Sequence, residues 1–235
     1  DLIIVDSSHP DGIAEELFTE TFYQNCYRTL KSDGALCIQS EGPFYNEAIF
    51  KNLNTCLKKI FGKKKVKENV VANIFVNSIL NTIDNGFAEI AGIINDSPEF
   101  IITPQISTAD DNAFTLIVIA ANLHFIPEYI HDAKEERVTN LIFSKLSNVF
   151  DCDQEKLEKV VKEYQCYLMK KNHPSKNMRY AISKGIFWKY NLNEYQDEYF
   201  KNMRSPNPMF LKRLDEAMDS FIWNWDTFKQ KYQIA

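Results

Sequence analysis

Residues 1–12 have the sequence DLIIVDSSHPDG, and this stretch decides the fold expected for the N-terminal part of the chain. Leu2 to Val5 form a short apolar run that ends at an acid, Asp6. Such a run is typical of a parallel strand that is buried on both faces. The Ser, Pro, Asp and Gly residues that follow favour a turn. Because ligands of open α/β sheets bind at the carboxyl ends of the strands, Asp6 is a candidate site residue.

The strand–helix pattern repeats in the next segment. A helix is expected to start at Glu15 or Thr19 and to end at Lys31, because apolar residues recur there every four positions. A second buried strand is predicted over residues 35–39 and a second helix over residues 46–61. The order strand, helix, strand, helix (βαβα) predicts an α/β fragment that forms half of a doubly wound, Rossmann-like sheet.

A fragment of this size leaves part of its sheet without a neighbour. Two parallel strands and two helices expose one edge and one face of the sheet. We therefore expect this surface to be covered by the rest of the chain, by a second copy in a homo-oligomer or by a complementary chain.

Three groups of residues follow one another at a defined spacing in this part of the chain. The first group is Asp6-Ser7-Ser8-His9-Pro10 with Gly12, Ala14, Glu15, Leu17 and Phe18. The second and third are Phe22-Tyr23 with Leu30-Lys31-x-Asp33-Gly34, and Gln39-Ser40-Glu41-x-Pro43-Phe44. Through these residues and their spacing, residues 1–62 resemble the spermidine synthases, which are polyamine aminopropyltransferases. The resemblance covers the C-terminal half of the Rossmann-like catalytic domain of that family.

The resemblance implies a transferase chemistry for Asp6. The family moves an aminopropyl group from decarboxylated S-adenosylmethionine, its co-substrate, to a diamine such as putrescine. The carboxylate at Asp6 would act as the general base that orients and deprotonates the amine. The resemblance further implies that the amine is bound by His9, Gln39 and Glu41, and that the nucleoside is contacted by Ala14 and Leu17.

The segment also departs from the family. His9 stands where the family usually has a second acid, and a neutral imidazole supplies no negative charge for a diamine. The glycine-rich loop that holds the nucleoside has no counterpart, since the chain contains no G-x-G-x-x-G pattern. We expect the chain as given to be an incomplete or inactive aminopropyltransferase that binds no cofactor.

Residues 67–235 predict a second, mainly helical domain, separated from residues 1–66 by a basic run. Apolar periodicity predicts a bundle of about six or seven helices. One helical stretch, over residues 69–95, is expected to break near Asp84-Asn85-Gly86, and the last helix is expected over residues 210–232. Asp153 is predicted to cap the helix that ends at Lys171.

Composition excludes several classes of protein. The chain has 235 residues and a net charge of −5, so its overall electrostatics do not favour a nucleic-acid partner. No apolar run is long enough to span a membrane. The five cysteines form no C-x-x-C pair and predict reduced thiols in a cytoplasmic protein.

Two interpretations of function remain open at this point. The first is an aminopropyltransferase, or a part of one, with Asp6 as its base. The alternative is a non-enzymatic helical binding or interaction module that carries a relic of a transferase. A metal site near His124 and His131 is disfavoured against an ordinary charged surface, because no pair of ligands has metal-binding spacing.

Overall fold

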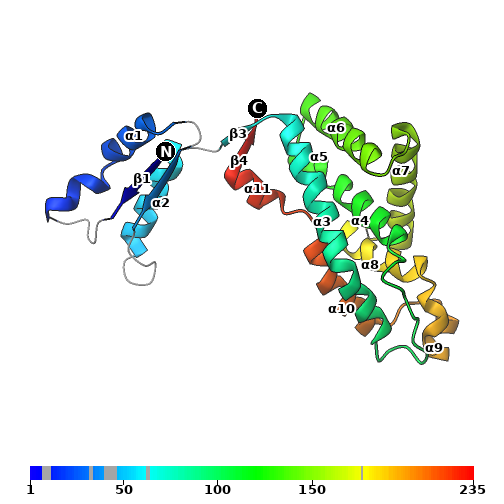
Figure 1. Cartoon of the computed structure of the whole chain (residues 1–235). Coiled ribbons are helices and arrows are strands. Elements are labelled where there is room, and N and C mark those ends of the chain that lie inside the picture. The colour runs from blue at the N-terminus through cyan, green and yellow to red at the C-terminus, as the bar shows by residue number, and fades with distance from the viewer. Residues whose placement is uncertain (7–11, 32–33, 40–46, 62–63, 176) are drawn as a thin grey trace. The chain divides into compact units, whose positions relative to one another are not determined.

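The computed structural model describes residues 1–6, 12–31, 34–39, 47–61, 64–175 and 177–235. The chain divides into two compact units, shown in Figure 1. The first unit holds residues 1–65 together with 228–233, and the second holds residues 66–227 together with 234–235. A short α/β piece followed by helices, as expected, is therefore confirmed.

The first unit is built from two strands and the helices that follow them. Its elements are β1 (Leu2–Val5), the 3-10 helix η1 (Gly12–Phe18), α1 (Glu20–Thr29), β2 (Ala35–Ile38) and α2 (Glu47–Phe61). The strands pair in parallel, with Leu2 opposite Ala35 and Val5 opposite Ile38. Thr19 caps α1, since its hydroxyl accepts a hydrogen bond from the Phe22 N–H at 3.2 Å.

One face of the β1–β2 sheet is bare. Leu2 and Ile4 are 62% and 66% exposed, and Ala35 and Cys37 beside them are also exposed. Val5 points to the other face and is buried. Parallel sheets otherwise occur with both faces covered. The uncovered face that the sequence predicts is therefore present in the described part of this unit. The expectation of strands buried on both faces is wrong here, because Val5 is the one buried residue of β1 and β2.

The remainder of the described chain is mainly helical. It comprises α3 (Glu68–Asn95), α4 (Asn112–His124), α5 (Ile126–Tyr129), α6 (Ala133–Val149), α7 (Gln154–Lys171), α8 (Met178–Lys189), η2 (Leu192–Tyr195), α9 (Glu198–Met203), α10 (Pro208–Met218), η3 (Asp219–Phe221) and α11 (Trp225–Lys231). Two further short strands, β3 (Lys64–Val66) and β4 (Tyr232–Ile234), pair with each other.

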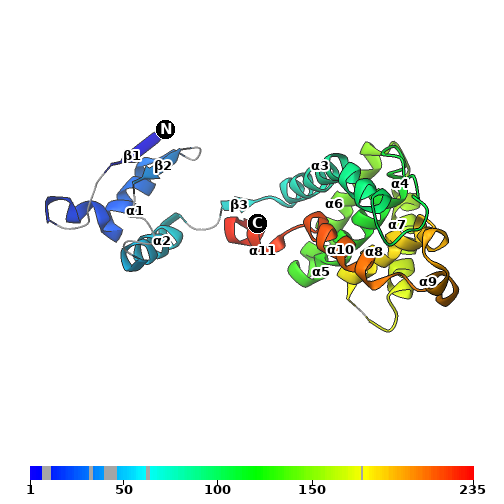
Figure 2. The ribbon, with the colours of Figure 1, turned by 90° about the horizontal axis from the view of Figure 1, so that it is seen from below.

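The core of the second unit forms around α3 and α4. In Figures 1 and 2, α3 runs along the length of the unit, and it packs against α4, α6 and α10. α4 is buried on all sides, because each residue from Ile117 to Leu123 is buried. This accounts for its nearly continuous apolar sequence. At the start of α3, the Glu68 carboxylate accepts hydrogen bonds of 2.9 and 2.7 Å from Arg137 on α6.

The break expected near Asp84-Asn85-Gly86 is wrong, because α3 continues without interruption through these residues. Gly86 packs against the Phe221 ring, whose Cζ lies 2.5 Å from the position that a β-carbon would take. The glycine therefore serves close packing here and does not end the helix.

The single helix expected over residues 210–232 is also wrong. α10 ends at Met218, and the chain leaves helical geometry between Phe221 and Trp225. The buried side chain of Asn122 binds this segment. It donates to the Phe221 carbonyl oxygen at 2.9 Å and accepts from the Trp223 N–H at 2.8 Å. These contacts use backbone groups that a continuous helix would have paired internally.

Among the described residues, none of the helices combines the length and the apolar character that crossing a lipid bilayer requires.

Candidate functional site

Asp6 and Gln39 lie side by side at the carboxyl ends of the two parallel strands. Asp6 follows β1 directly, and Gln39 follows β2. The Gln39 N–H donates to the Val5 carbonyl oxygen at 2.8 Å, which extends the β1–β2 ladder by one step. Parallel pairing places both residues at the same end of the sheet. The structure thus brings together two of the residues predicted for the site.

The Asp6 carboxylate is exposed and has no hydrogen bond or ion pair with another described residue. Gln39 is exposed as well. An accessible carboxylate without an internal partner can attract an ammonium group and accept its hydrogen bonds. In chemical terms, this strand end can bind and orient a cationic amine.

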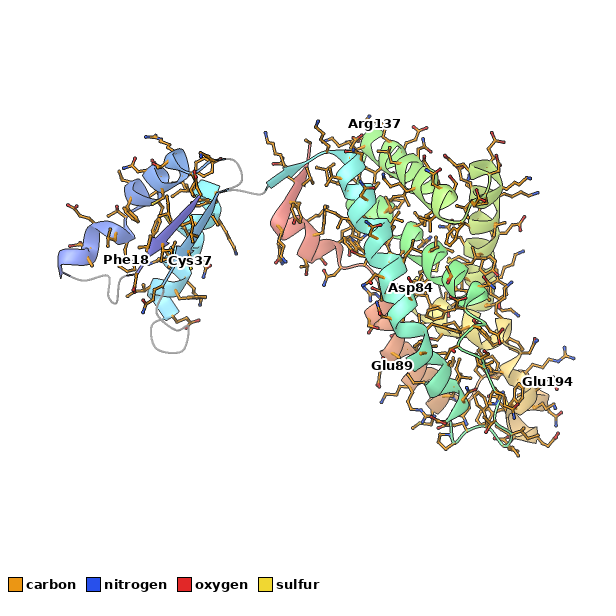
Figure 3. The ribbon with its side chains drawn as sticks, in the orientation of Figure 1. Phe18, Cys37, Asp84, Glu89, Arg137 and Glu194 are labelled. Carbon is orange, nitrogen blue, oxygen red and sulfur yellow. The ribbon has the colours of Figure 1, made fainter. Side chains whose placement is uncertain are left out.

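Ala14 and Leu17 lie on η1, and both are partly exposed. Figure 3 labels Phe18 at the end of this 3-10 helix and Cys37 on β2. His9 and Glu41, the other two residues predicted for the site, lie outside the described residues.

A small cleft of about 280 Å³ lies between α1 and α2. Glu20 and Lys59 line it and form an ion pair of 2.8 Å. The Lys59 hydrogen bond lowers the pKa of the Glu20 carboxyl, and the same bond raises the pKa of the Lys59 ammonium. The charges of Glu20 and Lys59 neutralise each other, and Arg28 is the further charged residue of the lining. No sequence pattern predicts this pair, because it depends on how two separate helices pack.

Tyr23 is the most deeply buried aromatic residue of the first unit, with an exposed fraction of 0%. Burial raises the pKa of its hydroxyl to about 12. Tyr23 therefore stays neutral at physiological pH and belongs to the buried side of α1. Elsewhere in the described residues, no group of three or more His, Cys, Asp or Glu side chains could hold a metal ion.

Comparison with known proteins gives a consistent result for the N-terminal part. Residues 1–83 match the family model of the spermine/spermidine synthase domain. No solved structure gives a significant match.

Curated relatives match stretches of 47 to 74 residues of the chain. A polyamine aminopropyltransferase of Lachnoclostridium phytofermentans is 62% identical over 47 residues, which are 20% of this chain and 17% of that protein. The polyamine aminopropyltransferase of Clostridium botulinum strain Eklund 17B is 46% identical over 74 residues, 32% of this chain and 26% of that protein. That of Clostridioides difficile strain 630 is 51% identical over 63 residues, 26% and 22% of the two chains.

The match thus spans about a quarter or less of the length of each of these relatives. The match to the family model includes Asp6, Gln39 and the helices α1 and α2. The N-terminal part of the chain therefore matches a segment of the spermine/spermidine synthase domain family.

Proposed function

We propose that the first unit is the part of an aminopropyltransferase domain that carries the amine-activating carboxylate, Asp6. The observation that supports this most directly is the position of Asp6 beside Gln39, at the carboxyl ends of two parallel strands. We also propose that β1, α1, β2 and α2 are half of a doubly wound, Rossmann-like sheet, because their order and parallel pairing are those of such a fold.

The proposed reaction transfers an aminopropyl group from decarboxylated S-adenosylmethionine to a diamine such as putrescine. Asp6 holds the amine and accepts its proton, so that the nitrogen has a free electron pair. The nitrogen attacks the carbon bound to the sulfonium, a C–N bond forms, and the C–S bond breaks. The electrons of that bond stay on sulfur, and 5′-methylthioadenosine leaves as a neutral thioether.

The other predicted site residues keep their proposed roles. His9, Gln39 and Glu41 would hydrogen-bond the diamine, and Ala14 and Leu17 would contact the nucleoside. Because the match covers no more than 26% of a relative listed above, we propose that this chain needs further polypeptide, from a complementary chain or a second copy, to bind the nucleoside and to react. All five cysteines are free, which supports a cytoplasmic location.

The experiment measures binding and turnover together. Isothermal titration calorimetry with 5′-methylthioadenosine and with putrescine is run on the chain alone. It is repeated on a mixture with the part of the Lachnoclostridium phytofermentans enzyme that the match leaves out. We expect the mixture to bind both ligands and to release 5′-methylthioadenosine from the co-substrate. Neither binding nor release in the mixture would sink the proposal.

A substitution tests the role of Asp6 in the same mixture. Asp6→Asn keeps the size of the side chain but removes the base, so turnover should fall by about a hundredfold or more. Asp84→Asn is the control, because Asp84 is exposed on α3 in the other unit (Figure 3) and should leave turnover unchanged.

A second candidate is a non-enzymatic binding module in the helical unit, with the first unit as a relic. The distribution of buried residues favours it. Of the twelve largest fully buried side chains, only Tyr23 belongs to β1, α1, β2 or α2. The helical unit thus has the larger core, and it has no matched counterpart beyond residue 83 in the family model. Absence of any transferase activity in the mixture would favour this candidate.

A further inference from the structure

The surface shared by α7 and α8 carries a lysine–aromatic cluster, which consists of Tyr164, Tyr167, Lys171, Trp188 and Lys189. The three residues of α7 lie on one side of that helix, because positions three and four apart are neighbours. Trp188 and Lys189 end α8, which packs against α7. The three rings are partly exposed and both lysines are exposed.

The ammonium groups of Lys171 and Lys189 both lie beside the Tyr167 ring. The Lys189 Nζ is 4.3 Å from the centre of the Tyr164 ring and 5.0 Å from that of Tyr167. The Lys171 Nζ is 4.4 Å from the centre of the Trp188 ring and 5.8 Å from that of Tyr167. Neither ammonium forms an ion pair with a carboxylate of the described residues. Two positive charges therefore lie beside the Tyr167 ring, and aromatic faces compensate them.

The aromatic part of the cluster is held in place. The Tyr167 hydroxyl donates to the Gly185 carbonyl oxygen at 3.1 Å, which fixes the ring against α8. Burial raises the pKa of Tyr167 to about 12, so the ring carries no charge at physiological pH. The platform on the two packed helices is therefore fixed, and the lysine side chains that lie over its rings are the groups that move to receive a ligand.

An open groove of about 680 Å³ follows α7 and reaches the cluster at Tyr167. Both signs of charge line it, from Glu155, Glu158, Lys159, Lys162 and Glu163 to Lys170. The groove thus gives a ligand access to the Tyr167 side of the cluster, and Lys170 adds a positive charge there. The net charge of −5 for the whole chain opposes a long polyanion but not a small one.

We propose that the lysine–aromatic cluster binds a small nucleoside phosphate. The phosphate accepts hydrogen bonds from Lys171 and Lys189, the two ammonium groups beside the Tyr167 ring. The base stacks on Trp188 or Tyr164 in place of the lysine side chain that covers the ring. This site is independent of Asp6 and of the transferase proposed above.

The test uses the full chain and ADP labelled with a fluorescent methylanthraniloyl group. Anisotropy should show saturable binding to the unaltered protein. The double variant Lys171→Glu with Lys189→Glu should weaken this binding by about tenfold or more, because it replaces both phosphate contacts with repulsive charges. Trp188→Leu should weaken it as well, through loss of stacking. The control, Lys156→Glu with Lys212→Glu, makes the same change of charge at exposed lysines outside the cluster and should leave binding unchanged.

Four outcomes would overturn the proposal. They are an absence of saturable binding, an equal loss in the control variant, competition by pyrophosphate as strong as that by ADP, and much tighter binding of a labelled oligothymidylate than of ADP. The last would assign the cluster to a nucleic-acid strand. Circular dichroism checks that each variant is folded, and Lys171→Gln with Lys189→Gln replaces the glutamate pair if that pair is not.

Discussion

Asn122 is a buried polar residue whose hydrogen bonds shape the C-terminal part of the helical unit. It is 1% exposed, and its amide donates to the carbonyl oxygens of Val118 and Phe221, each at 2.9 Å. Its side-chain oxygen accepts from the Trp223 N–H. A buried amide with this many partners stabilises the fold. Without it, a buried partner group would have lost its hydrogen bonds to water and gained none in the protein.

Replacing Asn122 by alanine should lower the free energy of unfolding by about 2–4 kcal/mol, because two backbone groups would be left buried and unpaired. Urea denaturation followed by circular dichroism measures this. Asn85→Ala is the matched control, since Asn85 is exposed and its side chain bonds only to Asn81 within the same helix. Equal losses in the two variants would contradict the role given to Asn122.

Asp215 predicts a dependence of stability on pH. Burial raises the pKa of its carboxyl above the ordinary value of 3.8, and Asp219 raises it further, against the opposing effects of Ser183 and Lys184. A folded-state pKa above the unfolded one means that the folded state binds the proton more tightly. The contribution of Asp215 is therefore unfavourable above its folded pKa, and it is relieved as the pH falls through that value towards 3.8.

Asp215→Asn should accordingly raise the free energy of unfolding at pH 7 by up to about 1 kcal/mol, after allowance for solvent screening. The gain should shrink as the pH is lowered towards 3.8. Thermal melts over this range measure the effect, with Asp84→Asn as the exposed control. A gain that does not change with pH would contradict the explanation.

At the scale of single elements, α3 shows what apolar periodicity predicts and what it misses. The periodicity predicted a helix over residues 69–95, and α3 occupies nearly the same range. The Asp153 cap is likewise confirmed, since its carboxylate accepts from the Lys156 N–H at 3.0 Å. The expected break at Gly86 was wrong because the reason for this glycine is the Phe221 ring, which comes from a segment far along the chain.

Two glycines of α3 make a matched pair for a test. A β-carbon at Gly86 would lie 2.5 Å from the Phe221 Cζ, whereas one at Gly92 would meet nothing within 4 Å. Gly86→Ala should therefore cost about 1–3 kcal/mol of unfolding free energy through overpacking. Gly92→Ala should add up to about 1 kcal/mol, because alanine favours the helix. Chemical denaturation of both variants measures the difference, and a loss of the same size at both positions would refute it.

In the candidate site, too, the sequence predicts features that depend on neighbouring residues and misses those formed by residues far apart in the chain. Asp6 and Gln39 each follow a segment predicted as a strand, and the parallel pairing of β1 and β2 places the two residues next to each other. The Glu20–Lys59 pair and the lysine–aromatic cluster had no such signal. Each forms between residues of two helices, and their distance depends on the way those helices pack.

At the scale of the whole molecule, the division into two units has a thermodynamic consequence. The helical unit has its own core, in which Phe114, Ile117 and Phe187 are completely buried. The first unit has a bare sheet face and few buried residues. A unit with a larger apolar core is expected to unfold independently and at a higher temperature.

A fragment of residues 66–235 should therefore fold without the rest of the chain. We expect a cooperative melt whose midpoint lies within a few degrees of the upper transition of the full chain. Differential scanning calorimetry of both proteins measures this. A fragment that melts without cooperativity would show that its core depends on residues 1–65.

The bare face of the β1–β2 sheet has a further consequence for the protein in a cell. Leu2 and Ile4 are exposed on a two-stranded sheet, and each of its strands has a single described neighbour. Such a surface adds strands from other chains and is bound by chaperones or degraded when nothing covers it. The amount of this protein that accumulates should therefore follow the amount of the polypeptide that covers the sheet, so that co-expression raises its yield and its half-life together.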